Sequence, residues 1–260
     1  MGILNITPDS FYDGGRYNGL ESHISHAARM ISEGAAIIDL GAVSSRPGAE
    51  EVSQNEEKQR LVPVLRELVK RFPDTIFSVD TYRSEIAKAA VENGAFIIND
   101  ISGGDMDAGM FPVMAGLNAA YIFMHMKGIP STMQVNPVYE DVTSEVHDYL
   151  SQKLSLLKSY GVQHVAADPG FGFGKTIRLN YTLLNHLHKF TDLGVPLLVG
   201  LSRKSMIYRL LNILPDEALN GTAVIQTIAL LQGADILRVH DVKEAVEAIR
   251  LVHEYRQAGK

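Results

Sequence analysis

The sequence predicts a single (β/α)8 barrel, the TIM-barrel fold, over residues 1–260. Short apolar stretches rich in Ile, Val, Leu and Ala recur along the whole chain. They are almost continuously hydrophobic, as parallel strands must be when both of their faces are covered. Amphipathic stretches lie between them, and eight such pairs without a linker favour a closed barrel. A doubly wound open sheet is the alternative fold, but nothing marks the reversal of strand order that it needs.

Eight strands are expected, and their starts lie 21 to 45 residues apart, which leaves room for a helix each time. They are residues 2–7, 36–42, 75–80, 96–102, 119–125, 164–170, 196–202 and 235–241.

Several short motifs predict where the helices begin and end. The sequence SQNE at 53–56 is a capping box, although Pro63 is expected to kink or delay the helix that follows. The sequence DVKE at 241–244 has the same spacing before the last helix. Gly34 and Gly94 follow amphipathic stretches at positions where helices stop.

Composition and charge exclude several classes of protein. The net charge of −6 and the pI of about 5.8 disfavour a nucleic-acid or anionic-membrane partner. An anionic substrate would therefore need a local cluster of basic side chains. Zero cysteines exclude disulfides, thiolate catalysis and cysteine-ligated metal sites. The first apolar run, residues 2–6, is too short for a signal peptide or a membrane span, so the expected location is the cytoplasm.

The sequence DPGFGFGKT at 168–176 suggests a phosphate-binding P-loop, but the pattern fails. A P-loop requires a glycine five positions before Gly174, and Pro169 stands there. Proline lacks the N–H group from which a phosphate cradle is built. A flexible turn between a strand and a helix is the other interpretation of such a glycine run.

Almost every expected strand ends in a polar or ionisable residue. Taken singly, each could simply cap the next helix. Together they predict an active site, because the catalytic face of such a barrel is the C-terminal end of its strands. These residues are Asn5, Asp39, Asp80, Asn99, His125, Asp168, Ser202 and the pair Arg238 and His240.

Arg238 and His240 are two residues apart on one strand, so both side chains point to the same side. We expect that side to be the barrel mouth, where an unpaired guanidinium would be costly. An anionic ligand would satisfy it. The alternative, an internal salt bridge to Asp39 or Asp80, stays open.

Three long loops are expected on the catalytic face. Residues 8–19 and 43–52 are polar or rich in glycine and carry Arg16 and Arg46, and residues 126–140 form the third. Arginine-bearing loops over a barrel mouth are typical of a lid for an anionic leaving group. A solvated loop has a similar composition.

Several motifs together resemble the dihydropteroate synthases, folate-pathway enzymes that join a pterin to 4-aminobenzoate. The resemblance extends from the first residue to the last helix, and it implies that the glycine-rich turn belongs to a pterin site. The motifs are MGILNITPDSFYDGG, SSRPGAE, VDTYRSEIA, NDISGG, MHMKGIP, DPGFGFGKT, VGLSRKSMI and ILRVHDV.

The resemblance implies a pterin pocket. A carboxylate at Asp168 would accept two hydrogen bonds from the guanidine-like edge of the pterin. Asn99 would offer a donor and an acceptor to the ring nitrogens. Asp80 would stabilise positive charge near the ring, and Lys204 would bind its O4 and N5 side.

It also implies sites for the leaving group and for the second substrate. The pyrophosphate would be held by Asn5, Arg46, Arg238 and His240, with Mg²⁺ beside Asn5. The 4-aminobenzoate would lie against Ser45, Pro47, Phe173 and Ser205. We also expect a homodimer.

The implied reaction releases pyrophosphate from 6-hydroxymethyl-7,8-dihydropterin diphosphate through a pterin methylene cation, which the arylamine then attacks. It needs no nucleophilic residue, and its catalytic groups would be Asp80, Lys204, Arg238 and His240. The chain has Ser45 where the family commonly has threonine, which predicts looser contact with aminobenzoate and puts the effect of sulfonamides in question. Family members usually carry an extra N-terminal segment that covers the barrel bottom.

Two other functions are alternatives to a dihydropteroate synthase. A methyl-tetrahydrofolate:corrinoid methyltransferase would share the Asp and Asn of the pterin pocket but has no need of Arg46, Lys204 and the pair Arg238 and His240. A non-catalytic pterin-binding paralogue would be expected to lose pyrophosphate ligands, and the sequence retains them.

Overall fold

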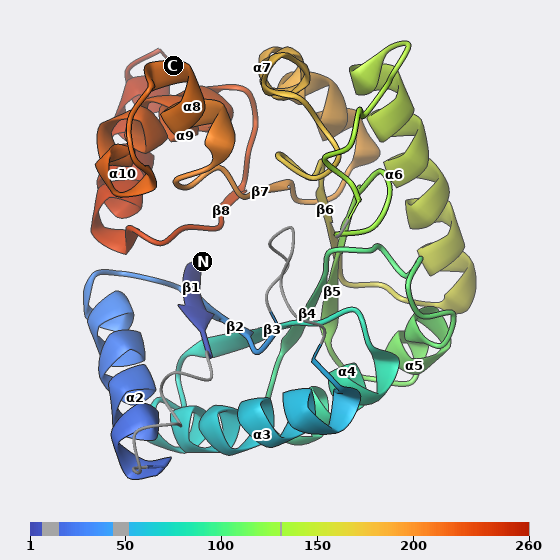
Figure 1. Cartoon of the computed structure of the whole chain (residues 1–260), viewed down its shortest axis with the longest axis vertical. Coiled ribbons are helices and arrows are strands. Elements are labelled where there is room, and N and C mark those ends of the chain that lie inside the picture. Colours follow the sequence, from blue (N-terminus) through green and yellow to red (C-terminus); the bar gives the residue numbers. More distant parts are fainter. Residues whose placement is uncertain (7–15, 44–51, 131, 260) are drawn as a thin grey trace.

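The computed structural model describes residues 1–6, 16–43, 52–130 and 132–259. Within these ranges, eight parallel strands surround a central axis, and helices cover the outside of the ring (Figure 1). The strands are β1 (Gly2–Asn5), β2 (Ile37–Gly41), β3 (Ile76–Asp80), β4 (Ile97–Asp100), β5 (Ala120–Met124), β6 (Val165–Asp168), β7 (Leu198–Val199) and β8 (Ile236–Leu237).

Helices connect these strands in chain order. They are α2 (Arg16–Ser32), α3 (Gln54–Arg71), α4 (Ser84–Glu92), α5 (Met110–Ala115), α6 (Val142–Tyr160), α7 (Ile177–Asn185), α8 (Ser205–Leu211), α9 (Leu219–Leu231) and α10 (Val242–Ala258), with the 3₁₀ turns η1 (Leu187–Leu193) and η2 (Pro215–Glu217).

Two isolated bridges close the ring. Strands β1 to β6 form one parallel ladder, and β7 and β8 form a second, shorter one. Ala167 pairs with Leu197 between β6 and β7, and Gly2 pairs with Val239 between β8 and β1. The Ile3 amide donates to the Val239 carbonyl at 2.9 Å across the second junction. The barrel that the apolar runs predict is therefore confirmed.

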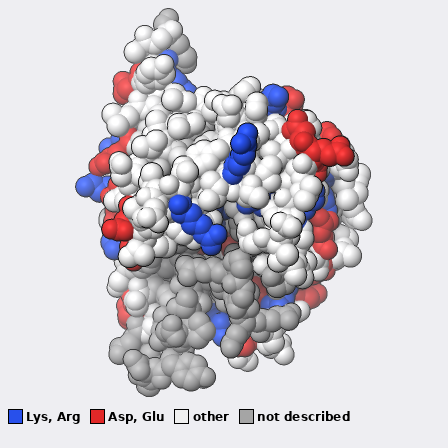
Figure 2. Space-filling model, turned by 45° about the horizontal axis from the view of Figure 1, so that its top comes forward, with Lys and Arg blue, Asp and Glu red and all other residues white. Residues whose placement is uncertain are grey.

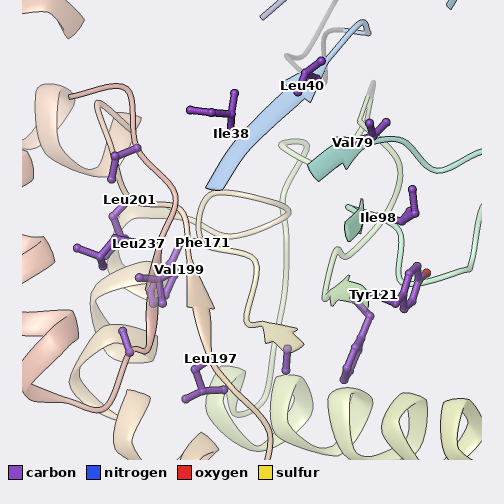
Figure 3. Close-up of a cluster of buried hydrophobic side chains, with 14 of the residues drawn as sticks. Ile38, Leu40, Val79, Ile98, Tyr121, Phe171, Leu197, Val199, Leu201 and Leu237 are labelled. Atoms are coloured by element: carbon purple, nitrogen blue, oxygen red, sulfur yellow. The ribbon is translucent and has the colours of Figure 1, made fainter. Parts of the chain in front are cut away.

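The outward side chains of the strands pack against the helices. Ile38 and Leu40 of β2 lie on this side and are fully buried (Figure 3). Val79, Ile98 and Tyr121 belong to the same core, which continues over the β7 and β8 region of the barrel. Each is directly next to an inward-facing residue, because side chains alternate along a strand.

The inward side chains fill the barrel in layers. A small apolar cluster, Ile97, Ile122, Ala166 and Leu198, lies inside the ring, and Ile236 packs against it. Nearer the C-terminal ends of the strands, the inward positions become polar. This apolar floor keeps the polar residues above it at one end of the barrel.

The helix signals are largely confirmed. Ser53 is the N-cap of α3, and its hydroxyl accepts from the Glu56 amide at 3.3 Å. Pro63 does not delay this helix, which begins at Gln54 and continues past the proline. Its buried residues hold it against the barrel and offset the one missing backbone donor. Gly34 and Gly94 have φ values of 99° and 97°, as helix-terminating glycines do.

The region after β7 differs from a regular barrel unit. Two helices, α8 and α9, follow this strand within the described part of the chain, where the sequence predicts one. Asn212 ends α8 in the left-handed conformation with φ 55°, and Pro215 begins η2. Both residue types are typical at helix breaks, because asparagine tolerates positive φ and proline cannot continue a helix.

Candidate active site

Side-chain alternation brings the sequence-predicted polar residues to one end of the barrel. Asp39 lies between two core residues of β2, and Asp80 ends β3. Asn99 is paired in register with Ile122, which faces the apolar floor. Asp168 and Arg238 lie at the ends of β6 and β8. Five strands therefore contribute one polar group each to the same mouth.

Arg238 is held by two carboxylates from neighbouring strands. Its Nε donates to Asp39 Oδ2 at 2.6 Å, and its Nη2 donates to Asp80 Oδ2 at 2.8 Å. Asp39 is fully buried, whereas the side chains of Asp80 and Arg238 are 15% and 21% exposed. The guanidinium thus has partners without an added anion. The internal salt bridge that the sequence left open as an alternative is therefore present.

Burial and charge shift the pKa values of this group in opposite directions. Burial lowers the pKa of Arg238, but the two carboxylates outweigh that effect and hold it above its usual range. Burial raises the pKa of Asp80 to about 7, because Arg238 offsets only part of the cost and Asp39 adds repulsion. The mouth therefore holds a permanent cation beside a carboxylate whose ionised form is disfavoured by burial.

Asn99 is oriented by the same buried carboxylate. Its Nδ2 donates to Asp39 Oδ2 at 3.1 Å, and the residue is 4% exposed. One amide proton is thereby used inside the protein. In the described part of the chain the carbonyl oxygen and the second proton of the amide have no hydrogen-bond partner, and these are the groups to which the family resemblance assigns acceptor and donor roles.

Asp168 is buried at the start of the glycine-rich turn. Its Oδ1 accepts from the Gly170 amide at 2.7 Å. Burial raises its pKa, and Lys204 opposes the shift. Gly170 has φ 72°, and a Cβ there would lie 1.9 Å from the His125 carbonyl oxygen. The turn therefore requires glycine at this position because the backbone passes close to β5, which is a packing reason and not a phosphate cradle.

Lys175 is hydrogen-bonded to the backbone of this turn, a role that the sequence did not predict. Its side chain is 2% exposed, and its Nζ contacts His125 Nδ1, the Gly170 carbonyl and the Phe173 carbonyl at 3.0, 2.8 and 3.1 Å. All three ammonium protons are used on the protein itself. The lysine that suggests a P-loop is thus a structural support, and its burial beside Asp168 is the signal that only the structure provides.

His125, the polar residue that ends β5, serves this turn as well. Burial and then the Lys175 charge lower its pKa to about 3. The ring is therefore neutral. Its Nδ1 accepts a hydrogen bond from the Lys175 ammonium, so the proton of the ring lies on Nε2.

Lys204 follows the neighbouring strand β7 and contacts the same turn. Its Nζ donates to the Phe171 carbonyl and lies 4.6 Å from the centre of the Phe173 ring. Burial lowers its pKa to about 8, although Asp168 opposes the shift. Ser205 is the first residue of α8, so its position at a helix N-terminus is confirmed.

The residues expected to hold pyrophosphate are only partly described. Asn5 is exposed at the end of β1, and its Oδ1 lies beside Gly41, as does the Asp80 carboxylate. His240 is exposed, and its amide donates to Ser202 Oγ at 3.3 Å. Ser45, Arg46 and Pro47 lie outside the described residues.

The expected loops are also partly described. Residues 8–15 and 44–51 lie outside the described ranges, and Arg16 belongs to helix α2. The third loop follows β5 and is tied to the turn of Asp168. Tyr139 donates its hydroxyl to the Gly174 carbonyl at 2.9 Å, and the Lys127 ammonium lies 4.0 Å from the Tyr139 ring centre.

The surface shows basic groups despite the net negative charge. One face carries separate Lys and Arg side chains among uncharged atoms, with acidic residues gathered toward its edge (Figure 2). Among the described residues, no group of three or more His, Asp or Glu side chains is placed to hold a metal. Within the same ranges, no helix combines the length and apolarity needed to cross a membrane.

Comparisons with known proteins agree with this geometry. A family described as pterin binding enzyme matches residues 1–240. Dihydropteroate synthase of Escherichia coli (strain K12) is 48% identical over 254 residues, covering 97% of this chain and 89% of that protein. Dihydropteroate synthase of Bacillus subtilis (strain 168) is 40% identical over 259 residues, covering 100% and 89%.

Solved structures show the same fold. Dihydropteroate synthase of Yersinia pestis in a sulfonamide complex has a TM-score of 0.92 and 44% identity, covering 99% of this chain and 94% of that one. Dihydropteroate synthase of Xanthomonas albilineans in complex with 7,8-dihydropteroate has a TM-score of 0.87 and 37% identity, covering 98% and 92%. The chain therefore belongs to the pterin-binding enzyme family.

Proposed function

We propose that this chain is a dihydropteroate synthase. It condenses 6-hydroxymethyl-7,8-dihydropterin diphosphate with 4-aminobenzoate and releases pyrophosphate and 7,8-dihydropteroate. The observation that carries the proposal is the convergence of a buried carboxylate, a buried amide and two cations at one barrel mouth, namely Asp168, Asn99, Lys204 and Arg238. The full-length similarity to curated dihydropteroate synthases supports it.

The pterin would bind between the turn and the β4 end. Asp168 is already desolvated, so it has little water to lose when it accepts two hydrogen bonds from the guanidine-like edge of the ring. Asn99, held by Asp39, presents its carbonyl oxygen and one amide proton to the neighbouring ring atoms. Lys204 contributes a cation from the segment after β7, beside the turn. A neutral planar ring with alternating donors and acceptors fits this set.

Arg238 would bind the diphosphate without releasing its carboxylates. A guanidinium has five N–H donors, and Asp39 and Asp80 take one each among the described residues. Three donors are left for phosphate oxygens. As the C–O bond breaks, negative charge grows on the leaving group, so a fixed guanidinium stabilises the transition state more than the bound substrate. His240 and Arg46 would share this role.

Asp80 would stabilise the pterin methylene cation. Its carboxylate is desolvated and partly neutralised by Arg238, and a positive charge developing nearby favours its ionised form. The arylamine of 4-aminobenzoate then attacks the cation. Phe173 and Ser205, with Ser45 and Pro47, would bind the aminobenzoate, and the α8 N-terminus would face its carboxylate.

The donor set beside the mouth fits Mg²⁺. The Asn5 amide oxygen and the Asp80 carboxylate both lie close to Gly41, and oxygen ligands of this kind are those that Mg²⁺ prefers together with substrate phosphates. When bound, Mg²⁺ would neutralise charge on the departing pyrophosphate. Asn5 would be its protein ligand.

A homodimer is part of the proposal. Its supporting observation is an apolar surface on the region after β7, where side chains that would ordinarily be buried are 39% to 68% exposed. They are Leu210, Leu211, Leu214, Val224, Ile228 and Leu231. A second copy of the chain would cover this surface. Sedimentation of the parent and of an Ile228→Glu variant would test it, since the variant should sediment as a monomer.

A product assay tests the function. The protein is supplied with both substrates and Mg²⁺, and pyrophosphate and dihydropteroate are quantified. Both products should form in equal amounts and only when both substrates are present. Asp168→Asn is the matched control, since it preserves shape and removes one acceptor. Pterin binding without dihydropteroate formation would instead favour a non-catalytic paralogue.

A further inference from the structure

Arg203 has an unusual backbone conformation for its residue type. Its φ is 52°, in the left-handed region. In the described part of the chain, the other non-glycine residues with positive φ are Asn136 and Asn212. Asparagine tolerates this region through local hydrogen bonds, whereas arginine has no such compensation. Strain of this kind persists only where surrounding contacts hold it, and it is typical of functional sites.

Asp241, the ion-pair partner of Arg203, does not cap its helix as an aspartate at the N-cap ordinarily does. It stands at the N-cap of α10, but its two oxygens are bonded to Arg203 and not to the helix. Arg203 Nε donates to Oδ2 at 2.9 Å, and Nη2 donates to Oδ1 at 2.7 Å. This correction to the predicted capping box has a clear cause, because a two-bond ion pair is stronger than a single capping bond.

The pair joins the segments that directly follow β7 and β8, residues 200–204 and 238–241, which are called the exits of these strands. Arg203 immediately precedes Lys204, and Asp241 immediately follows His240. The ladder between these strands has two register pairs, and its last backbone hydrogen bond runs from the Arg238 amide to the Val199 carbonyl at 3.0 Å. Beyond that point the two exits are linked by side chains, namely by this ion pair and by the bond from the His240 amide to Ser202 Oγ.

The two exits carry different halves of the proposed substrate site. Lys204 lies over the Phe173 ring on the pterin side, whereas Arg238 and His240 lie on the diphosphate side. The bond that breaks in the reaction lies between these halves. The distance between the two exits must therefore match the length of the intact pterin diphosphate. A pterin without phosphates, or pyrophosphate alone, would contact only one exit.

We propose that the Arg203–Asp241 ion pair is a positioning pair that sets the spacing between the pterin-binding and the diphosphate-binding halves of the site. The inference rests on the proposed function. It predicts that losing the pair weakens the binding of pterin diphosphate much more than the binding of the pterin without phosphates. A purely structural role would weaken both equally, or neither.

Asp241→Asn is the most informative variant. Asparagine caps a helix as well as aspartate does, so the variant keeps or improves the start of α10 while it loses the charge. Arg203→Asn is the second variant, since asparagine tolerates the left-handed backbone. Asp216→Asn is the matched control, because Asp216 touches the same guanidinium at 3.3 Å but its side chain is 98% exposed.

The experiment measures two affinities by calorimetry, for 6-hydroxymethylpterin and for its diphosphate with Mg²⁺, together with kcat and the thermal midpoint. For both pair variants we expect an affinity for the diphosphate about 10-fold to 100-fold lower, as for a partly buried charge-assisted contact. The pterin affinity should stay within about twofold, and Asp216→Asn should match the parent.

Two results would overturn the inference. In one, the pair variants bind the diphosphate as the parent does. In the other, they lose both affinities in the same proportion together with the thermal midpoint. The ratio of the two affinities is measured without turnover. A parent that binds both ligands but forms no dihydropteroate would therefore contradict the proposed function alone, and this inference would still be decided by the ratio.

Discussion

Arg238 donates its Nε–H to the Oδ2 of Asp39 across 2.6 Å, and Asp39 is fully buried. The two residues come from the last and the second strand, so this bond also spans the junction at which the barrel closes. Because Asp39 Oδ2 also accepts from Asn99, one carboxylate orients a group on each side of the mouth. The catalytic face is therefore organised by a residue that lies beneath it.

Replacing Arg238 should cost stability as well as activity. Arg238→Met keeps the apolar stem but leaves Asp39 buried without its cation, which should lower the free energy of unfolding by ~3–5 kcal/mol. The double variant Arg238→Met/Asp39→Asn should recover much of that loss, since the lone charge is gone. Urea denaturation of the parent, both single variants and the double variant measures it. Additive single effects would show that the two residues act independently.

Asp168→Asn should weaken pterin binding. The amide places a donor where the carboxylate accepts from a donor, so the loss should be ~2–4 kcal/mol, in the range for a buried charged hydrogen bond. Calorimetry with 6-hydroxymethylpterin measures it. Asp105→Asn is a suitable control, because Asp105 is an exposed carboxylate bonded to Lys153 on the outer surface. Unchanged pterin affinity in Asp168→Asn would remove this residue from the pocket.

Phe173→Leu should affect the two substrates unequally. The ring lies under the Lys204 ammonium and would flank the aminobenzoate ring, and an aromatic contact contributes ~0.5–1.5 kcal/mol. The KM for 4-aminobenzoate should therefore rise roughly 2-fold to 10-fold. The KM for the pterin diphosphate should change little. Steady-state kinetics with each substrate varied in turn measures both values, and an equal rise in both would argue against an aminobenzoate site at Phe173.

Lys175 should make stability depend on pH. Burial lowers its pKa to about 7, although Asp168 opposes the shift, whereas an unfolded lysine has a pKa of about 10.4. Between these values the unfolded chain binds more protons than the folded one, so stability rises with pH. Below about pH 7 both states are protonated and the contribution is constant.

The comparison with Lys175→Met isolates this effect, because every other titrating group is retained. From about pH 7 to about pH 10, the parent should gain stability relative to the variant, with a slope of up to ~1.4 kcal/mol per pH unit. Denaturation curves across that range measure it. Parallel pH profiles for the two proteins would mean that Lys175 does not titrate in this window.

The barrel could be predicted from the sequence because its signals are local. Apolar runs, the Ser53 cap and the glycines after helices each act within a few residues. The polar strand ends could be predicted for the same reason, since alternation along a strand decides which side chain faces inward. These signals sufficed to place Asp80, Asn99, Asp168 and Arg238 at one mouth.

The partners of those residues could not be predicted, because pairing depends on distance in space. The bond between Arg238 and Asp39 joins residues 199 positions apart, and the sequence allowed an anionic ligand equally well. Lys175 lies in a Gly-Lys-Thr sequence that is better known from phosphate-binding loops. Its burial and its bonds within the protein show that it supports the turn instead. Asp241 follows a capping pattern that a tertiary ion pair overrides.

The central claim is that the carboxylates of the mouth and the cations that hold the leaving group drive the reaction through a pterin methylene cation, without a covalent bond to the protein. The most direct test uses pterin diphosphate with ¹⁸O in the oxygen that bridges the methylene carbon and phosphorus, incubated with the protein and Mg²⁺ but without 4-aminobenzoate. If the cation forms reversibly, the label should move into the non-bridging positions of the recovered substrate. A label that stays entirely in the bridge, in a sample that turns over once 4-aminobenzoate is added, would contradict the account and favour direct displacement by the amine.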